Sequence, residues 1–145
     1  MIAFDDVTVG DALPGASFPV TREHLVRYCG ASGDFNTIHW SERIAREVGL
    51  PDVIAHGMFT MATAVRVVTD WCGDPGAVVE YGARFTKPVP VPDVGGAVVD
   101  VTAVVAVKDD AARTVRVDLT ATIPGADGAD PVGVLGRARA VVRLA

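Results

Sequence analysis

IAHGMFTMATAVRVV, at residues 54–68, is apolar or small at nearly every position. A helix that is hydrophobic on most of its surface has to be covered by other elements of the fold. We therefore predict that this run forms a buried central helix and that the rest of the chain is arranged around it.

The segments after this run have the composition of β-strands. Four stretches are rich in Val, Thr and Ala: 78–89, 97–107, 113–123 and 132–144. Proline, glycine and aspartate separate them, as expected of turns. Within 113–123, Val115, Val117 and Leu119 alternate with polar residues, so one face of that strand should meet a core while the other meets water. Helices followed by a series of strands predict an α+β fold, with an antiparallel sheet folded around the central helix.

The first half of the chain contains two further helical patterns. Thr21 is a suitable N-cap for a helix at 22–29. A second helix is predicted to run from His39 to Val48, with Glu42, Arg43, Arg46 and Glu47 as its solvated face. Its apolar stripe is Trp40, Ile44 and Val48.

Composition limits the classes of protein to which the chain can belong. With 145 residues, half of them hydrophobic, residues 1–145 are most simply one globular domain. No stretch reaches the roughly 18 apolar residues of a membrane span, and the acidic N-terminus is unlike a signal peptide, so we expect a cytoplasmic protein. A net charge of −5 without a basic run disfavours nucleic acid as a ligand. Cys29 and Cys72 form no metal-binding or disulfide pattern and are expected to be reduced.

A carboxylate, an amide and an imidazole lie close together in ASGDFNTIHW, residues 31–40. Asp34 and His39 would point apart on one regular helix, because five residues correspond to about 500° of rotation. They converge only if the chain turns between them, and Asn36 favours such a turn because it is a preferred N-cap. His39 would then sit at the third helical position, where the positive helix N-terminus favours a neutral imidazole that can act as a base. The alternative is a simple capping turn with His39 on the surface.

Gly57 lies near the start of the predicted central helix, where glycine is unfavourable by about 1 kcal/mol relative to alanine. A glycine at this place lets a ligand approach backbone N–H groups that the helix leaves unpaired, and these suit a developing oxyanion. The alternative is a glycine required only for close packing of helix and sheet. His56, directly before it, is interpreted as a structural hydrogen-bonding residue and is not included among the catalytic residues.

Several motifs together resemble a known family. Tyr28, the segment SGDFNTIH at 32–39 and Ala45 together resemble the signature of the MaoC-like, R-specific enoyl-thioester hydratase/dehydratase family, which has the hot-dog fold. Three further motifs extend the resemblance: AHGM at 55–58, GDPG at 73–76 and FTKPV at 85–89. With these, the chain resembles in particular the catalytic B-type subunits of actinobacterial (3R)-hydroxyacyl-acyl carrier protein dehydratases. One departure is Thr37, where the family usually has proline; threonine loses the preset φ but leaves the Asn36 cap intact.

The resemblance implies the chemistry and its residues. Asp34 and His39 would act as the acid/base pair in a syn elimination or addition of water, the Gly57 N–H would stabilise the oxyanion, and Asn36 would orient the loop. The implied reaction is dehydration of (3R)-hydroxyacyl thioesters on acyl carrier protein in type II fatty-acid synthesis. The alternatives are an (R)-specific enoyl-CoA hydratase of fatty-acid degradation or polyester precursor supply, and a non-catalytic hot-dog partner subunit. Neither a metal nor a cofactor is expected, because no ligand cluster or dinucleotide motif is present in the sequence.

The family also implies partners. Hot-dog domains of this family pair into a continuous sheet, so we expect either a homodimer or a heterodimer with a related hot-dog subunit. The acyl substrate would arrive on acyl carrier protein or CoA, with no role for nucleic acid or membranes. An acidic carrier protein calls for a cationic patch. Five residues are candidates for it: Arg43, Arg46, Arg66, Arg84 and Lys87.

Overall fold

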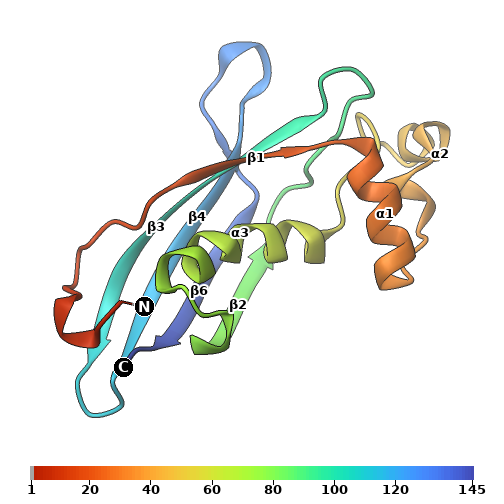
Figure 1. The fold of residues 1–145 in the computed structure, drawn as a ribbon. Helices are drawn as coiled ribbons and strands as arrows, with labels where there is room; N and C mark the ends of the chain where they lie inside the picture. Colours follow the sequence, from red (N-terminus) through yellow and green to blue (C-terminus); the bar gives the residue numbers. More distant parts are fainter. Residues whose placement is uncertain (1) are drawn as a thin grey trace.

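The computed structural model describes residues 2–145, and it contains three α-helices and six strands within that part of the chain (Figure 1). The helices are α1 (Arg22–Ser32), α2 (Glu42–Glu47) and α3 (Gly57–Cys72). The strands are β1 (Ala16–Val20), β2 (Val78–Phe85), β3 (Ala97–Asp109), β4 (Thr114–Ile123), β5 (Val132–Gly133) and β6 (Leu135–Arg143). The predicted strand 132–144 is thus divided at Val134, where the chain leaves β5 and enters β6.

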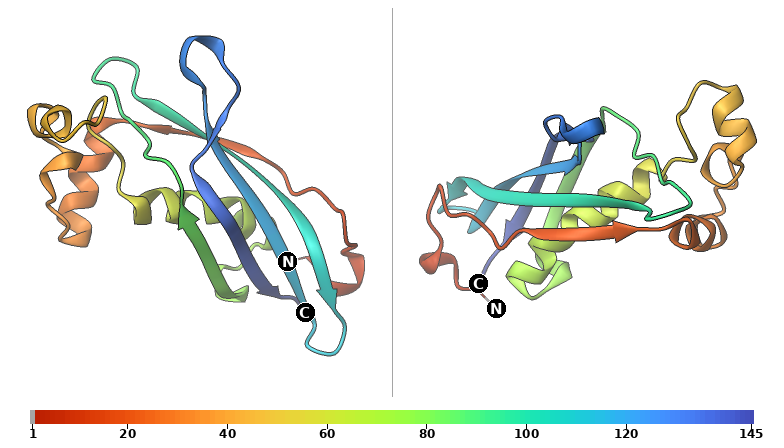
Figure 2. Two further views of the ribbon diagram at one scale, coloured as in Figure 1. Left: turned by 180° about the vertical axis from the view of Figure 1, so that it is seen from behind. Right: turned by 90° about the horizontal axis from the view of Figure 1, so that it is seen from above.

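The strands form one antiparallel sheet in the order β1-β3-β4-β6-β2, and β5 extends it by pairing with the end of β4. The sheet curves around α3, which lies across its concave side, while α1 and α2 lie together beyond one end of α3 (Figures 1 and 2). The predicted α+β, hot-dog architecture, an antiparallel sheet wrapped around a long helix, is confirmed. In this architecture the first turn of α3 points toward α1 and α2.

The alternating strand pattern is also confirmed. Val115, Val117 and Leu119 of β4 are all buried, and they join the single large apolar cluster between the sheet and α3. Cys29 and Cys72 are both free and buried, as expected of packing residues. No helix of residues 2–145 is both long enough and apolar enough to cross a bilayer.

α3 is only partly enclosed, so the prediction of a helix covered on most of its surface is wrong for this chain alone. Its inner face packs against β2, β3, β4 and β6. The outer face exposes every fourth residue: Met58, Ala62, Arg66 and Asp70. One curved sheet can contact only one side of a cylinder, so the residues on the other side, Met58 and Ala62 among them, remain uncovered.

The predicted continuous helix from His39 to Val48 is interrupted. Thr37–His39 forms a single 3-10 turn, and α2 begins anew at Glu42 because the Ser41 hydroxyl accepts a hydrogen bond from the Ile44 N–H. The predicted apolar stripe is wrong as well. Trp40 and Val48 are 52% and 62% exposed, and Ala45 is the buried residue of α2.

Arg22 connects α1 to the elements around it. Its guanidinium donates to Glu42 at the start of α2 over 2.8 Å and to Asp52 over 2.6 Å, and it also donates to the Val91 carbonyl over 3.2 Å. The other charged groups of α2 pair within the helix, Arg43 with Glu47 and Arg46 with Glu42, so the predicted solvated face is confirmed. Arg22 thus joins the two helices that flank the loop between them.

Candidate active site

The loop between α1 and the 3-10 turn carries Asp34. Gly33 ends α1 in the left-handed region, at φ 75°, which suits glycine because it has no Cβ. The Asp34 Oδ1 then accepts a hydrogen bond from the Asn36 N–H at 3.1 Å, and the Asn36 side chain accepts one from the Ile38 N–H at 3.3 Å. Asn36 is therefore the N-cap predicted from the sequence.

This double turn brings the two predicted acid/base residues together. The Asp34 Oδ2 lies 4.0 Å from the His39 Nε2. Asp34 is largely exposed, whereas His39 is only 7% exposed. One polar, accessible carboxylate and one buried imidazole thus face each other across a gap slightly longer than a hydrogen bond.

His39 is held in a defined tautomer. Its Nδ1 lies 2.7 Å from the Ile54 carbonyl oxygen, so this nitrogen carries the proton and donates it. The Nε2 lone pair is then free on the side of Asp34. Burial lowers the pKa of His39 below 6.5, and the neighbouring His56 lowers it further, while the Ile54 carbonyl and Asp34 act in the opposite direction.

The neutral state of His39 therefore has a different cause from the one predicted. His39 ends the 3-10 turn and does not lie at the N-terminus of a long helix. Burial of the imidazole, which disfavours the charged ring, takes the place of the helix dipole. The expected direction of the pKa shift, toward a base that is neutral near pH 7, is the same.

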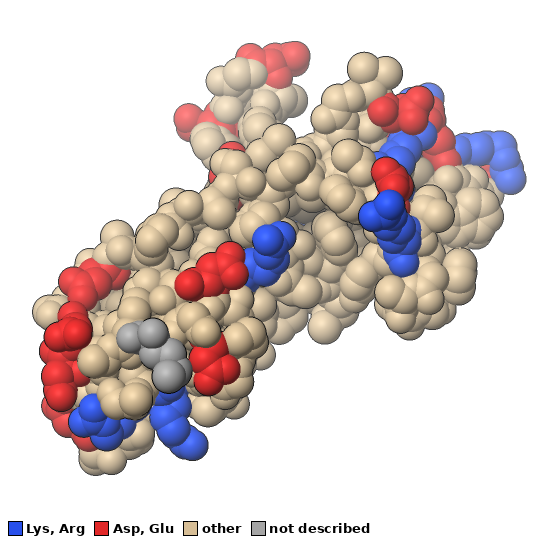
Figure 3. All heavy atoms as spheres, in the orientation of Figure 1, with Lys and Arg blue, Asp and Glu red and all other residues tan. Residues whose placement is uncertain are grey.

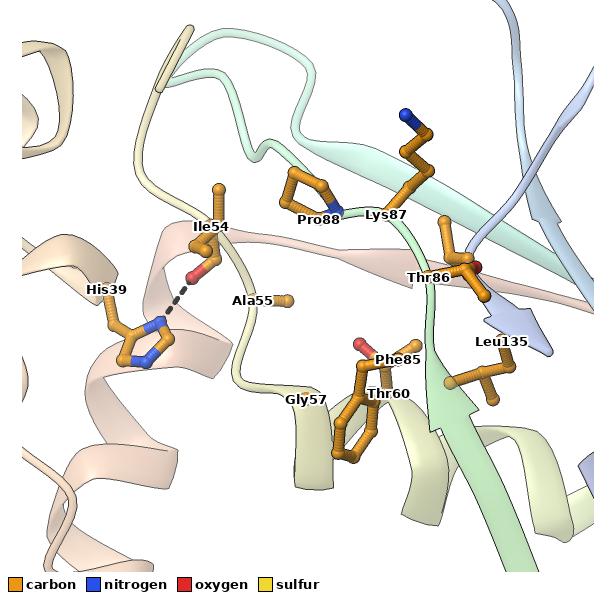
Figure 4. Close-up of a pocket in the computed structure, with 11 residues that line it drawn as sticks. His39, Ile54, Ala55, Gly57, Thr60, Phe85, Thr86, Lys87, Pro88 and Leu135 are labelled. Carbon is orange, nitrogen blue, oxygen red and sulfur yellow. Dashed lines mark hydrogen bonds between the residues drawn. The ribbon is translucent and has the colours of Figure 1, made fainter. Parts of the chain in front are cut away.

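Gly57 begins α3 and faces the same cavity as His39 (Figure 4). The cavity has a volume of about 380 Å³, and Thr60, Phe85 and Lys87 also contribute to its walls. As the first residue of the helix, Gly57 has an N–H group without an intrahelical partner. The His39 imidazole and the Gly57 N–H thus face one cavity. Asp34 is near His39 but is not among the residues that line this cavity.

Phe85 provides a packing reason for the glycine as well. A Cβ on Gly57 would lie 3.1 Å from two ring carbons of Phe85, closer than side chains normally approach. The packing alternative for Gly57 is therefore compatible with the structure and does not exclude the oxyanion role.

His56, interpreted from the sequence as a structural hydrogen-bonding residue outside the catalytic set, lies within this site. It is 2% exposed, and its ring stacks on that of His39 with the centroids 3.6 Å apart and the planes inclined by 21°. Its Nε2 lies 3.1 Å from the Asp34 carbonyl oxygen. The sequence feature that could have indicated a role in the site is the position of His56 in an otherwise apolar run, directly before Gly57.

Asp34, His39 and His56 each have one potential metal-ligand atom, all within 4.8 Å of one another. The two imidazole rings, however, are stacked on each other with their planes inclined by only 21°. One nitrogen of each ring is also occupied by a carbonyl group. This arrangement suits proton transfer better than metal coordination.

The predicted cationic patch is only partly gathered at the cavity. Lys87 lines it, whereas Arg43 and Arg46 pair with glutamates on α2 and Arg66 lies over the Phe18 ring. Figure 3 shows large areas of one face of the molecule without acidic or basic side chains. Of the five candidates, Lys87 is therefore the one that lines the cavity.

Comparisons with known proteins agree with this fold. The family model described as "MaoC like domain" matches residues 7–123. The chain is 39% identical over 83 residues to 3-hydroxyacyl-thioester dehydratase X of Mycobacterium tuberculosis, a match that covers 57% of this chain and 29% of that protein.

Two solved structures are similar over nearly the whole chain. A protein described as a MaoC-like dehydratase superposes with a TM-score of 0.92 and 41% identity, covering 99% of this chain and 42% of the other. The R-hydratase PhaJ1 from Pseudomonas aeruginosa has a TM-score of 0.81 and 22% identity, covering 99% of this chain and 85% of the other. This chain thus spans less than half of both the curated relative and the first of these structures.

Proposed function

Because the chain belongs to the MaoC-like domain family, we propose that it is a hydro-lyase that interconverts 2-enoyl thioesters and (3R)-hydroxyacyl thioesters. The observation that supports this most directly is the separation of 4.0 Å between the Asp34 Oδ2 and the His39 Nε2, beside a cavity that also contains the start of α3. The R configuration is inferred from the family.

The gap between the two catalytic residues suits a water molecule. A water oxygen about 2.8 Å from each atom fits this separation. In the hydration direction Asp34 and His39 orient the water, one of them takes a proton from it, and its oxygen forms a bond to the β-carbon of the enoyl thioester. Dehydration is the reverse: the same pair returns a proton to the departing hydroxyl group.

Charge develops on the thioester oxygen as the β-carbon is attacked, and the intermediate resembles an enolate. The unpaired N–H of Gly57 at the first turn of α3 is suited to stabilise this oxygen. The electrons then return to form a C–H bond at the α-carbon, which takes up a proton and completes the addition of water. Asn36 contributes by holding the loop that carries Asp34.

For the carrier of the acyl group, we favour acyl carrier protein and a role in type II fatty-acid synthesis. CoA and carrier protein both present a pantetheine phosphate, and Lys87 at the cavity wall is suited to either. The alternative is therefore an (R)-specific enoyl-CoA hydratase with the same site and chemistry. The two are distinguished by kcat/KM for the same acyl group on the two carriers.

The assembly that fits this function is a dimer, either of two copies or with a related hot-dog subunit. β2 is an edge strand with one unpaired side, and α3 exposes Met58 and Ala62. Open sheet edges and apolar helix faces are commonly covered by a second chain. A second chain that covers the β2 edge and the exposed side of α3 would satisfy both features.

The function is tested by hydration of crotonyl-CoA, followed as loss of the absorbance of the conjugated thioester. The native chain should be active, His39→Ala inactive, and His24→Ala should retain native activity because His24 lies in the capping box of α1. Native-like activity of a folded His39→Ala variant would overturn the site assignment. Inactivity of the native chain toward both crotonyl-CoA and crotonyl-acyl carrier protein would instead support the non-catalytic partner subunit.

A further inference from the structure

We infer that His56 is a positioning residue that holds both members of the acid/base pair in place. This inference builds on the proposed function, but its first test does not depend on activity. His56 contacts Asp34 through a hydrogen bond, stacks on His39, and directly precedes Gly57 in the chain. One buried side chain thus links the three groups on which the reaction depends.

The contact with Asp34 is made through the backbone. The His56 Nε2 lies 3.1 Å from the Asp34 carbonyl oxygen, which can only accept, so Nε2 carries the proton and donates it. The Cys29 sulfur also lies 3.7 Å from the same nitrogen. This hydrogen bond attaches the exposed catalytic loop to the rigid start of α3, which limits where the Asp34 carboxylate can move.

The contact with His39 fixes the plane of its ring. The hydrogen bond from Nδ1 to the Ile54 carbonyl alone would still let the His39 ring rotate about the hydrogen-bond axis. The His56 ring, stacked on it with the centroids 3.6 Å apart, prevents this rotation. The centroid of the Tyr28 ring lies 4.8 Å from that of the His56 ring, and the two planes are inclined by 57°. His56 is thus held between α1 and His39, and the Nε2 lone pair of His39 keeps its direction toward Asp34.

Opposite tautomers follow from these contacts. His39 carries its proton on Nδ1, whereas His56 carries it on Nε2. In the neutral His56 ring the remaining nitrogen, Nδ1, is buried and has no hydrogen-bond partner within the described residues. Leaving a buried polar atom unpaired is costly, and such a cost is typical of a side chain retained for a functional purpose.

Nitrogen NMR tests this directly on the native chain. The sequence contains only three histidines, so ¹⁵N-histidine labelling gives three sets of ring signals, which His24→Gln and His39→Gln assign by subtraction. Long-range proton–nitrogen correlations distinguish a protonated ring nitrogen from an unprotonated one. We expect Nε2–H at His56 and Nδ1–H at His39 at pH 7.5, and His56 with its proton on Nδ1 would overturn the inference.

Two substitutions separate the two contacts. His56→Gln keeps an N–H donor near the Asp34 carbonyl but removes the stacked ring, whereas His56→Phe keeps an aromatic ring and removes the donor. Each should lower kcat for crotonyl-thioester hydration by about 10- to 100-fold, the scale of a small misplacement of catalytic groups, with KM changed less. His24→Gln, the same chemical change in the capping box of α1, should leave kcat unchanged.

A pH profile distinguishes positioning from a merely structural role. The titratable groups around the stacked pair are Cys29 and Tyr28 of α1, Asp34 of the loop and Lys87 of the cavity wall. Loss of the His56 ring admits water to the face of His39, which relieves the burial that holds its pKa down. In His56→Gln the acidic limb of kcat/KM should therefore move to higher pH.

The dependence on His39 completes the test. If His56 acts through its neighbour, His56→Gln should change the residual rate of His39→Ala by less than about 2-fold, because coupled residues are not additive. A 10-fold further loss, or native kcat with an unshifted acidic limb in folded His56→Gln, would show that His56 is only a packing residue. If the native chain has no activity at all, the NMR tautomers and the His39 titration still decide the inference, independently of the proposed function.

Discussion

His39 combines a buried ring, a fixed tautomer and a free lone pair, and these properties depend on neighbours that are distant in sequence. The Ile54 carbonyl is 15 residues away and determines which ring nitrogen carries the proton. Asp34 and His39 are five residues apart, and their convergence was predictable because Asn36 is a strong capping residue. The stacking of His56 was not predictable, because it depends on how α3 meets the loop in the folded chain.

Substitution of either member of the acid/base pair should abolish most activity without affecting the fold. Asp34→Asn and His39→Ala are each expected to lower kcat by at least about 100-fold, the usual contribution of a general acid or base. Circular dichroism of Asp34→Asn should be unchanged, since the Asp34 side chain is exposed and its hydrogen bond, from the Asn36 N–H, is local. Asp110→Asn, in the turn between β3 and β4, is the matched control and should be fully active.

Stability should depend on pH through His39. Its pKa is lowered in the folded protein, so in the unfolded chain it takes up a proton at higher pH, near 6.5. The free energy of unfolding should therefore fall as pH decreases from about 6.5 through the folded-state pKa, by at most about 1.4 kcal/mol per pH unit. Urea titrations from about pH 5 to about pH 7.5, a range that brackets the ordinary pKa of a histidine side chain, should show a smaller dependence in His39→Gln. An identical dependence in both proteins would exclude His39 as its source.

At the scale of elements, a substitution at the start of α3 can distinguish the two explanations for Gly57, close packing and access of a ligand to its N–H. Gly57→Ala should stabilise the helix slightly, because alanine has the better helix propensity, but its methyl group meets the Phe85 ring at the end of β2. We expect activity to fall by at least about 10-fold through displacement of groups around the cavity. The double variant Gly57→Ala, Phe85→Leu is the control: recovery of activity would assign the glycine to packing, and continued loss would assign it to access to the N–H.

The ion-pair network around Arg22 should stabilise the arrangement of α1 and α2. Arg22→Met leaves Asp52, whose side chain is only 14% exposed, without its cation. We expect the free energy of unfolding to fall by about 1–3 kcal/mol, as measured by urea denaturation. Arg27→Met removes an exposed pair with Glu23 on the same helix and should cost less than about 1 kcal/mol. Equal effects of the two substitutions would contradict a special role for Arg22.

The sequence predicted structure well where a residue pattern repeats along one helix or strand, and poorly where a helix is interrupted. The alternation in β4 identified its buried face because each strand residue has a fixed side. The break at Trp40 and Ser41 was missed because a serine hydroxyl competes with the backbone to start a new helix, and this outcome depends on local geometry. The buried residue of α2 is consequently Ala45, and the larger Ile44 is only partly buried.

For the whole molecule, composition and element order predicted the layers but not their extent. A run of small and apolar residues indicated a buried helix, yet α3 is covered on one side only. In the proposed dimer a second chain would cover the other side, which would account for the difference between the predicted and the observed burial of α3. We expect this exposed side of α3 to lie in the interface of the proposed dimer.

Light scattering after size-exclusion chromatography should therefore find two chains per particle at micromolar concentration. Val79→Lys places a charge on the exposed side of the β2 edge and should shift the population toward monomer. Val104→Lys, on an exposed position of β3, which is not an edge strand, is the control and should leave the particle unchanged. A native chain that is monomeric in this measurement would remove the dimer proposal.

The break at Trp40 also gives the loop an optical reporter. The indole N–H of Trp40 donates to the Phe35 carbonyl over 3.1 Å, so the fluorophore is attached to the segment between Asp34 and His39. The chain has only one other tryptophan, Trp71 near the end of α3. In a Trp71→Phe variant, all tryptophan emission would come from this loop. Thioester binding should then change its intensity or wavelength, which would let stopped-flow fluorescence time the arrival of substrate separately from its conversion.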